Sequence, residues 1–137
     1  MSDCLFCKII RGEIPNHRVY EDERVLAFLD IHPVNPGHVL VVPKEHSETF
    51  LDMQKEDRDA VMDVVAKIGK GVMKAVGSPA CNFMCNVGSG SGQVIFHTHL
   101  HIIPRFEGDG RELWGAMKET PDLSALSEKI RETLSSL

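Results

Sequence analysis

The 137-residue chain lacks a hydrophobic run long enough to cross a membrane, since its longest apolar stretches, residues 25–29 and 39–42, are only strand-sized. It also lacks a secretory signal, because Met1-Ser2-Asp3-Cys4 contains neither a basic region nor an apolar core. We therefore expect a cytoplasmic protein. Lysine and arginine are not clustered, and 20 acidic against 15 basic residues give a formal charge of -5. This charge pattern argues against a surface that binds nucleic acid.

The four cysteines of a cytoplasmic chain are expected to be thiols or metal ligands rather than disulfides. Cys4 and Cys7 have the spacing of half a zinc site, although two small buried thiols on a helix would have the same spacing. Cys81 and Cys85 would stand about 13 Å apart on a strand, too far to share one ion. We expect this second pair to pack in the core.

The order of hydrophobic patterns predicts a single domain over residues 1–137, with a core at about 3–106 and a tail at 107–137. Three-to-four-residue spacing of apolar side chains predicts a long helix from Lys55 to Val76, stopped by Gly77. The fold class is therefore α+β, with an antiparallel sheet of about five strands. The remaining expected elements are a short helix at 5–11, strands at 19–20, 25–30, 38–43, 81–87 and 94–103, and a C-terminal helix from Pro121 capped by Thr120.

Three histidines alternate in His97-Thr98-His99-Leu100-His101. On a strand they share one face, about 7 Å apart, while Thr98 and Leu100 take the other face. Neutral imidazole is a nucleophile that can carry a phosphoryl group, and a second imidazole can protonate a leaving group. A catalytic zinc held by two of these rings is the competing interpretation that the spacing leaves open.

The segment from Gly92 to Arg105, Gly-Gln-Val-Ile-Phe-His-Thr-His-Leu-His-Ile-Ile-Pro-Arg, resembles the signature of the histidine-triad (HIT) proteins. Upstream segments agree in order and spacing: Asp30-Ile31-x-Pro33, the run from Pro36 to Lys44, and Asn86-x-Gly88. The resemblance weakens after Arg105 and implies a HIT-like fold. Val94 departs from it, because the eukaryotic nucleotide-binding branch has a hydroxyl at this position.

Roles for individual residues follow from this resemblance. His99 would be the nucleophile, His101 would contact the phosphate oxygens, and His38 would support the triad, whose first member is His97. Asp30 would bind the ribose hydroxyls. Asn86, Gly92 and Gln93 would bind the phosphate or the leaving group, and the apolar slot for the base would consist of Phe6, Ile9, Phe28, Leu29 and Ile31.

The HIT branch that contains galactose-1-phosphate uridylyltransferase has a similar Cys-x-x-Cys pair, whose zinc is completed by two histidines. The resemblance therefore implies a structural zinc held by Cys4, Cys7, His46 and His97. It leaves His99 and His101 free for chemistry. The other histidines, His17 and His32, are expected at the surface.

Together with the triad, the resemblance implies a nucleotide hydrolase that acts at the α-phosphorus of a nucleoside monophosphoryl substrate and releases AMP or GMP. A purine nucleoside phosphoramidase is the first expectation, and an asymmetric dinucleoside polyphosphate hydrolase the second. A zinc-dependent hydrolase and a non-catalytic nucleotide-binding regulator are the alternatives from other classes. No magnesium-binding motif is present in the sequence. The resemblance also implies a homodimer, in which Trp114 could approach the partner's site.

Overall fold

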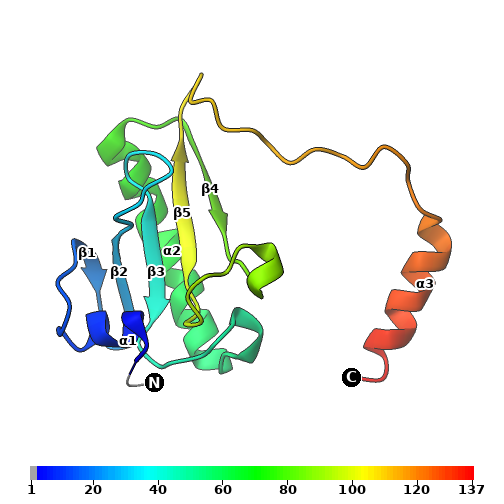
Figure 1. Cartoon of the computed structure of the whole chain (residues 1–137), viewed down its shortest axis with the longest axis horizontal. Coiled ribbons are helices and arrows are strands. Elements are labelled where there is room, and N and C mark those ends of the chain that lie inside the picture. Colours follow the sequence, from blue (N-terminus) through cyan, green and yellow to red (C-terminus); the bar gives the residue numbers. More distant parts are fainter. Residues whose placement is uncertain (1–2) are drawn as a thin grey trace.

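The computed structural model describes residues 3–137 and consists of one antiparallel sheet with helices on both sides (Figure 1). The strand order is β1-β2-β3-β5-β4, and each hydrogen-bonded pair is antiparallel. The α+β class and the five-stranded antiparallel sheet expected from the sequence are therefore confirmed. The strands are β1 (Arg18–Glu21), β2 (Val25–Leu29), β3 (Val39–Pro43), β4 (Ala80–Met84) and β5 (Leu100–Arg105), and the helices are α1 (Leu5–Ile10), α2 (Lys55–Val76) and α3 (Leu123–Leu134).

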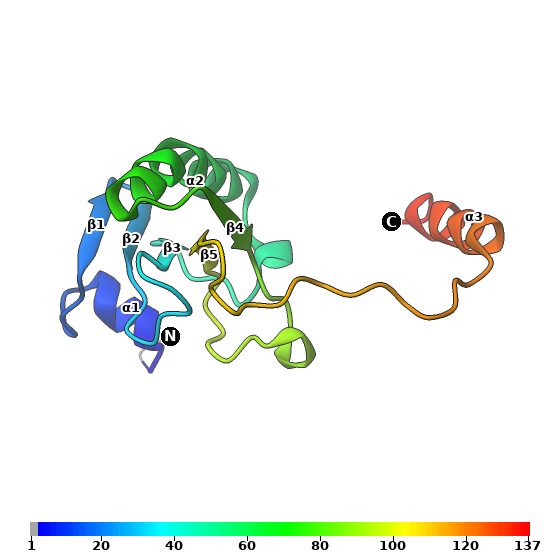
Figure 2. The same cartoon turned by 90° about the horizontal axis from the view of Figure 1, so that it is seen from above.

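Strands β2 and β3 are buried on both faces, which explains why they are continuous apolar runs rather than alternating ones. Val39 and Val41 of β3 belong to the core under α2, whereas Leu40 and Val42 pack with Phe6 of α1 on the opposite face. Figure 2 shows α2 above the sheet and α1 below it. The face covered by α1 is the one that carries the functional side chains.

Helix α2 has the bounds expected from its periodicity. Val61, Val64 and Val65 are buried against the sheet, and Glu56 in the first turn is a favourable charge at the positive end of the helix dipole. Gly77 ends the helix in the left-handed conformation with φ 70°, and its N–H bonds the carbonyl groups of the last turn. The stop signal that the sequence contains is therefore the one the structure uses.

The expected strand over 94–103 is wrong in its first half, because β5 begins at Leu100. In the segment before β5, Thr98 bonds to the loop after β3 instead of pairing with a neighbouring strand. The Thr98 N–H donates to the Ser47 carbonyl at 2.8 Å, and the hydroxyl groups of the same two residues lie 2.8 Å apart. Pro104 lies inside β5 rather than ending it. The pairing of β5 with β3 stops at Ile102, two residues before this proline.

The tail leaves the top of β5 as an extended arm and ends in α3, which stands away from the sheet (Figures 1 and 2). Asp122 caps this helix by accepting from the Ala125 N–H at 3.1 Å, so the cap expected at Thr120 is wrong. A carboxylate placed at the N-cap position of the helix satisfies an otherwise free N–H. Leu123, Ile130 and the rest of the apolar face are exposed.

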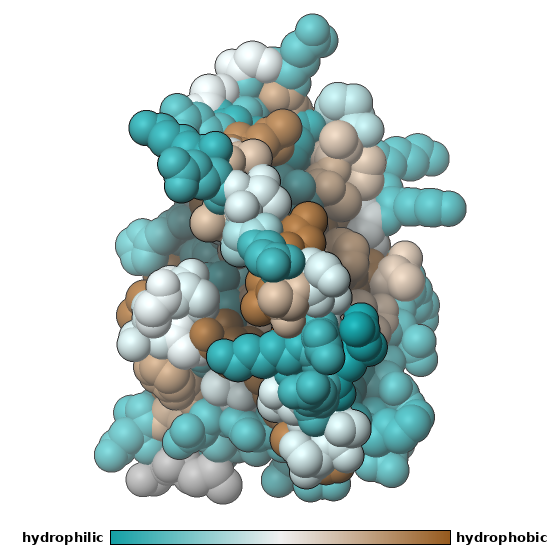
Figure 3. Space-filling view, turned by 90° about the vertical axis from the view of Figure 1, so that its right-hand side faces the viewer, coloured by the Kyte–Doolittle hydropathy of each residue, from teal (hydrophilic) through white to brown (hydrophobic). Residues whose placement is uncertain are grey.

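Seen from the side of the arm, the surface is mainly hydrophilic, with hydrophobic residues interspersed (Figure 3). Within residues 3–137, no helix combines the length and the apolar character required to cross a membrane.

Candidate active site and metal site

A cavity of about 440 Å³ opens on the α1 face of the sheet, between α1, the loop after β2 and the segment that precedes β5. Its walls are mainly apolar, and His99 and His101 lie in them. The substrate-binding residues expected from the sequence that line this cavity are Phe6, Ile9, Phe28, Leu29, Asp30, Ile31, Asn86 and Gly92. The structure thus brings residues from three separate segments, α1, the end of β2 with the loop after it, and residues 86–92, together with two of the triad histidines.

Phe6 connects the apolar wall to the triad. Its ring is 2% exposed and meets Phe28 edge to face, with centroids 5.6 Å apart. On the other side it makes edge contacts with His97 at 5.9 Å and with His99 at 5.0 Å. Both imidazoles are therefore held in place by a side chain of α1.

The tautomer of His99 follows from its surroundings. Its Nδ1 lies 2.7 Å from the carbonyl oxygen of His97, and a carbonyl can only accept, so Nδ1 carries the proton. The unprotonated nitrogen of the neutral ring is then Nε2. Burial lowers the pKa of His99, while the bond to the His97 carbonyl and the charge of Asp30 oppose that shift. His99 is thus a neutral imidazole with a free lone pair on Nε2.

The same reasoning fixes His38 and His101. The backbone N–H of Val34 donates to His38 Nδ1 at 3.0 Å, so the proton of neutral His38 is on Nε2. That Nε2 lies 2.8 Å from His101 Nδ1 and donates to it, which leaves the proton of His101 on its own Nε2. Burial, followed by the neighbouring His99 and His38, lowers the pKa of His101 to about 4. The ring centroids of His99 and His101 are 5.1 Å apart, so a proton donor stands next to the free lone pair of His99.

Asp30 lies just after β2, at the rim of the cavity. One carboxylate oxygen accepts from the His32 N–H at 2.8 Å, and the other lies 3.6 Å from His38 Nε2, too far for a hydrogen bond. The carboxylate retains acceptor capacity toward the cavity. It could accept hydrogen bonds from a ligand that has hydroxyl groups.

Gln93 lies behind the cavity wall rather than in it, and is 3% exposed. Its amide oxygen accepts from the Gly88 N–H at 2.9 Å, and its NH₂ group donates to the carbonyl groups of Glu48 and Ile95. These bonds hold the 88–92 turn against the loop after β3. The family resemblance implied that Gln93 contacts the phosphate or the leaving group, whereas in the structure its side-chain amide is bonded to the backbone of Gly88, Glu48 and Ile95.

Gly92 has φ 106°, in the left-handed region that favours glycine. A Cβ at this position would come within 3.4 Å of the Asn86 Nδ2 atom. That distance is an ordinary van der Waals contact, so the left-handed backbone, rather than a lack of space, favours glycine at this position of the cavity wall.

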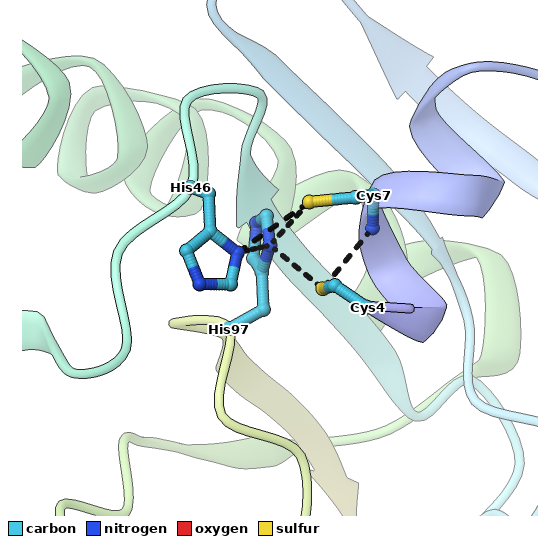
Figure 4. A group of neighbouring side chains, drawn as sticks. All are labelled: Cys4, Cys7, His46 and His97. Atoms are coloured by element: carbon cyan, nitrogen blue, oxygen red, sulfur yellow. Dashed lines mark hydrogen bonds between the residues drawn. The ribbon is translucent and has the colours of Figure 1, made fainter. Parts of the chain in front are cut away.

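The four expected zinc ligands converge, although they come from three distant segments (Figure 4). Cys4 and Cys7 lie at the start of α1, His46 follows β3, and His97 precedes β5. The Nδ1 atoms of His46 and His97 are 3.1 Å apart. Cys4 Sγ lies 3.4 Å from His97 Nδ1, and Cys7 Sγ lies 3.4 Å from His46 Nδ1 and 3.5 Å from His97 Nδ1.

These distances fit one tetrahedral zinc ion. Bonds of about 2.3 Å to sulfur and about 2.05 Å to nitrogen place two nitrogens about 3.4 Å apart, and a nitrogen and a sulfur about 3.6 Å apart. His97 Nε2 lies 2.8 Å from the Pro43 carbonyl and donates to it, so its Nδ1 presents a lone pair to the cluster. Burial, together with Cys4, raises the pKa of the Cys7 thiol to about 11 in the metal-free protein. A cation would stabilise the thiolates that this buried position disfavours.

Several cavity residues were not anticipated from the sequence. Asn16 and His32 line the cavity, as do Leu5 and Ile95. Among residues 3–137, the Oδ1 atom of Asn16 is one of two buried side-chain polar atoms that have no hydrogen-bond partner. Asn16 follows Pro15 in the loop between α1 and β1, and such a position carries no pattern that distinguishes a cavity wall from an ordinary surface loop.

Comparison with known proteins identifies the family. The model of the HIT domain matches residues 11–108, which is most of the chain. The chain belongs to the HIT family. The HIT family belongs to a superfamily of nucleotide-binding proteins and hydrolases, as the resemblance of the triad segment implied.

The similarity to individual relatives of this HIT protein covers more of the chain than residues 11–108. The Arabidopsis thaliana protein named adenylylsulfatase HINT3 is 41% identical, over 99% of this chain and 72% of its own length. A crystal structure from Streptococcus mutans UA159 has a TM-score of 0.92 at 38% identity, covering 99% of this chain and 86% of the other. A zinc-bound histidine-triad protein from Mycobacterium smegmatis has a TM-score of 0.75 at 32% identity, covering 98% and 95%.

Proposed function

We propose that this HIT protein hydrolyses a nucleoside monophosphoryl substrate at its α-phosphorus, through a covalent intermediate on His99. The observation that carries the proposal is the tautomer of His99. The bond from Nδ1 to the His97 carbonyl leaves Nε2 as an unprotonated nucleophile in the cavity wall. No proton has to be removed before it attacks.

In the first step His99 Nε2 forms a bond to phosphorus, and the bond from phosphorus to the leaving group breaks. His101 lies beside His99 and carries its proton on Nε2. This N–H can donate a hydrogen bond to a phosphoryl oxygen or to the departing group, which takes its proton from solvent. In the second step water attacks phosphorus and releases a proton to solvent, the bond to Nε2 breaks and returns its electron pair to His99, and the nucleoside monophosphate leaves with neutral His99 regenerated.

The apolar part of the cavity suits a nucleobase, and Asp30 at its rim suits a ribose. Phe6 and Phe28 offer flat, buried surface on one side of the cavity. The glycines of the 88–92 turn allow backbone N–H groups to approach an anion. Purine nucleoside phosphoramidates, which release AMP or GMP, are the first substrate class that we propose.

A second candidate is favoured by one relative. A chain 41% identical to this one carries the name adenylylsulfatase. Adenylyl sulfate presents the same adenosine and α-phosphorus, and differs in having sulfate as the leaving group. A substrate panel should therefore compare an adenosine phosphoramidate, adenylyl sulfate and an asymmetric dinucleoside polyphosphate.

The fitted zinc site is assigned a structural role. Bound zinc would link the start of α1 to the loop after β3 and to His97, and so hold Phe6 over the nucleophile. All four ligand positions would be filled by protein atoms, which is the arrangement of structural rather than catalytic zinc.

The test of the nucleophile is the variant His99→Ala. We expect turnover to fall by several orders of magnitude, about 10³-fold or more, because the covalent route is lost. Intact-mass analysis after rapid quenching should show a nucleotidylated wild-type chain and no adduct on the variant. His17→Ala, which changes an exposed histidine, is the control. Near-normal turnover of His99→Ala would contradict the assignment.

We also propose that two copies associate. Among residues 3–137, β4 pairs with β5 alone, so its outer edge is available to a second chain. The exposed apolar face of the 12-residue helix α3 needs a packing partner, since a helix this short is marginal by itself in water. Light scattering should give twice the chain mass of 15.2 kDa, and removal of residues 107–137 should weaken association.

A further inference from the structure

A second cluster of buried polar groups lies outside the cavity, where the arm leaves β5. Its centre is Asp109, whose side chain is 8% exposed. Arg105 donates to both carboxylate oxygens, from Nε at 2.8 Å and from Nη2 at 3.0 Å. The backbone N–H groups of Phe106 and Arg111 and the side-chain amide of Asn35 supply three more donors. The bonds from Arg105 and from these backbone groups hold the pKa of Asp109 well below its usual range.

This cluster forms hydrogen bonds with two residues of the loop between β2 and β3, Val34 and Asn35. Asn35 is 8% exposed, and its amide donates to the Pro104 carbonyl at 2.9 Å as well as to Asp109. Arg111 donates to the carbonyl of Val34 at 2.5 Å. Val34 and Asn35 are therefore fixed to the end of β5 and to the start of the arm.

Val34 and Asn35 are also the residues whose backbone groups form hydrogen bonds with His38. The Val34 N–H donates to His38 Nδ1, and the Asn35 carbonyl accepts from the His38 backbone N–H at 3.2 Å. The first of these bonds places the proton of His38 on Nε2, from where it is donated to His101. If the Val34 N–H moved away, Nδ1 would lose its donor, and the other tautomer of His38 would become accessible.

We propose that Asp109 and Arg111 are positioning residues, which keep His38 in the tautomer that donates to His101 by fixing the backbone of Val34 and Asn35. The proposal rests on the function assigned to His99 and His101, and it extends the functional unit to a cluster outside the cavity. The proposal also links the start of the arm to the triad. Arg105, which donates to Asp109, donates to the Arg111 carbonyl as well, at 2.8 Å, so the two positioning residues are joined through one side chain. A change at the arm would reach the site through this loop.

The test uses the zinc-loaded, full-length protein and the variants Asp109→Asn and Arg111→Ala. Nitrogen-15 NMR of the imidazole rings reads the tautomer of His38 without any substrate. In the wild type we expect an unprotonated Nδ1 and a protonated Nε2. In both variants the two His38 resonances should move toward each other, because the tautomers exchange.

Turnover provides the second measurement. We expect kcat of both variants to fall by about tenfold to a hundredfold, as small displacements of supporting groups do, with a smaller change in KM. Arg111→Lys, which retains a donor for the Val34 carbonyl, should recover part of the loss. Asp57→Asn is the matched control, because Asp57 is a similarly buried carboxylate that pairs with an arginine, Arg24, at 2.9 Å on the α2 side.

The outcomes separate this proposal from the proposed function. An unchanged His38 tautomer in folded Arg111→Ala and Asp109→Asn overturns it, whatever the activity. Equal losses of kcat in Asp57→Asn also overturn it, because the effect would then be general. A shifted tautomer in a protein that hydrolyses none of the panel supports the positioning role and contradicts the proposed reaction. If Asp109→Asn does not fold, Arg111→Ala decides, since Arg111 is exposed.

Discussion

Replacement of Cys7 by serine tests the zinc site most directly. Cys7 is 9% exposed, and its sulfur lies within 3.5 Å of both histidine nitrogens of the cluster. A serine hydroxyl is a much poorer zinc ligand than a thiolate, so the variant has three good ligands instead of four. We expect it to lose zinc and with it the stability that zinc binding confers on the folded chain.

The magnitude follows from linkage. If free zinc stands about 1,000-fold above its dissociation constant, binding stabilises the folded chain by about 4 kcal/mol. For a core of this size, that corresponds to about 15 °C in Tm. The ligands are spread over residues 4–97, so loss of the ion frees the start of α1, the loop after β3 and the segment before β5 together.

Thermal unfolding followed by circular dichroism, with and without a chelator, measures this effect. Cys81→Ser is the control, because Cys81 is a free thiol on β4, outside the cluster. We expect about one zinc per wild-type chain by elemental analysis, and a large loss of Tm in Cys7→Ser that the chelator reproduces in the wild type. Equal Tm values for the two serine variants, or a wild type that is insensitive to the chelator, would refute the reasoning.

Two further predictions concern the cavity. Asp30→Ala should weaken AMP binding at least about tenfold, because charge-assisted hydrogen bonds to ribose hydroxyls contribute about 1.5–3 kcal/mol each. Calorimetry with AMP and 2′-deoxy-AMP tests this prediction. Equal binding of the two nucleotides to the wild type would exclude the role of Asp30 in ribose binding. Burial gives His101 a pKa of about 4 in the folded chain against 6.5 when exposed, so the unfolded chain binds more protons between these values. Stability should therefore fall as the pH is lowered from about 6.5 to about 4, and zinc-loaded His101→Asn should lose less in denaturant titrations; parallel pH profiles for the two proteins would contradict this.

The sequence by itself determined the elements whose signals are local. The spacing of valines and the stop at Gly77 gave α2 its observed bounds. The alternation of His99 and His101 with Leu100 also held, because Leu100 packs under α2 while His101 faces the site. Burial on both faces made β2 and β3 recognisable as continuous apolar runs.

The local signal failed where backbone hydrogen bonds run to distant residues. The histidines of His97-Thr98-His99 alternate as they would on a strand, yet the Thr98 N–H bonds the Ser47 carbonyl, and a period of two cannot distinguish the two arrangements. Asp122 rather than Thr120 caps α3, since either residue type could fill that position.

Only the tertiary structure decided which hydrogen bonds connect the residues of the candidate site. The sequence contains His99, His101 and His38, but their tautomers depend on the carbonyl of His97 and on the N–H of Val34. The same holds for Asp109, which a sequence shows as one acidic residue in a polar tail. Its effect on the site depends on contacts across 74 positions to Asn35, and contacts at that separation exist only once the chain has folded.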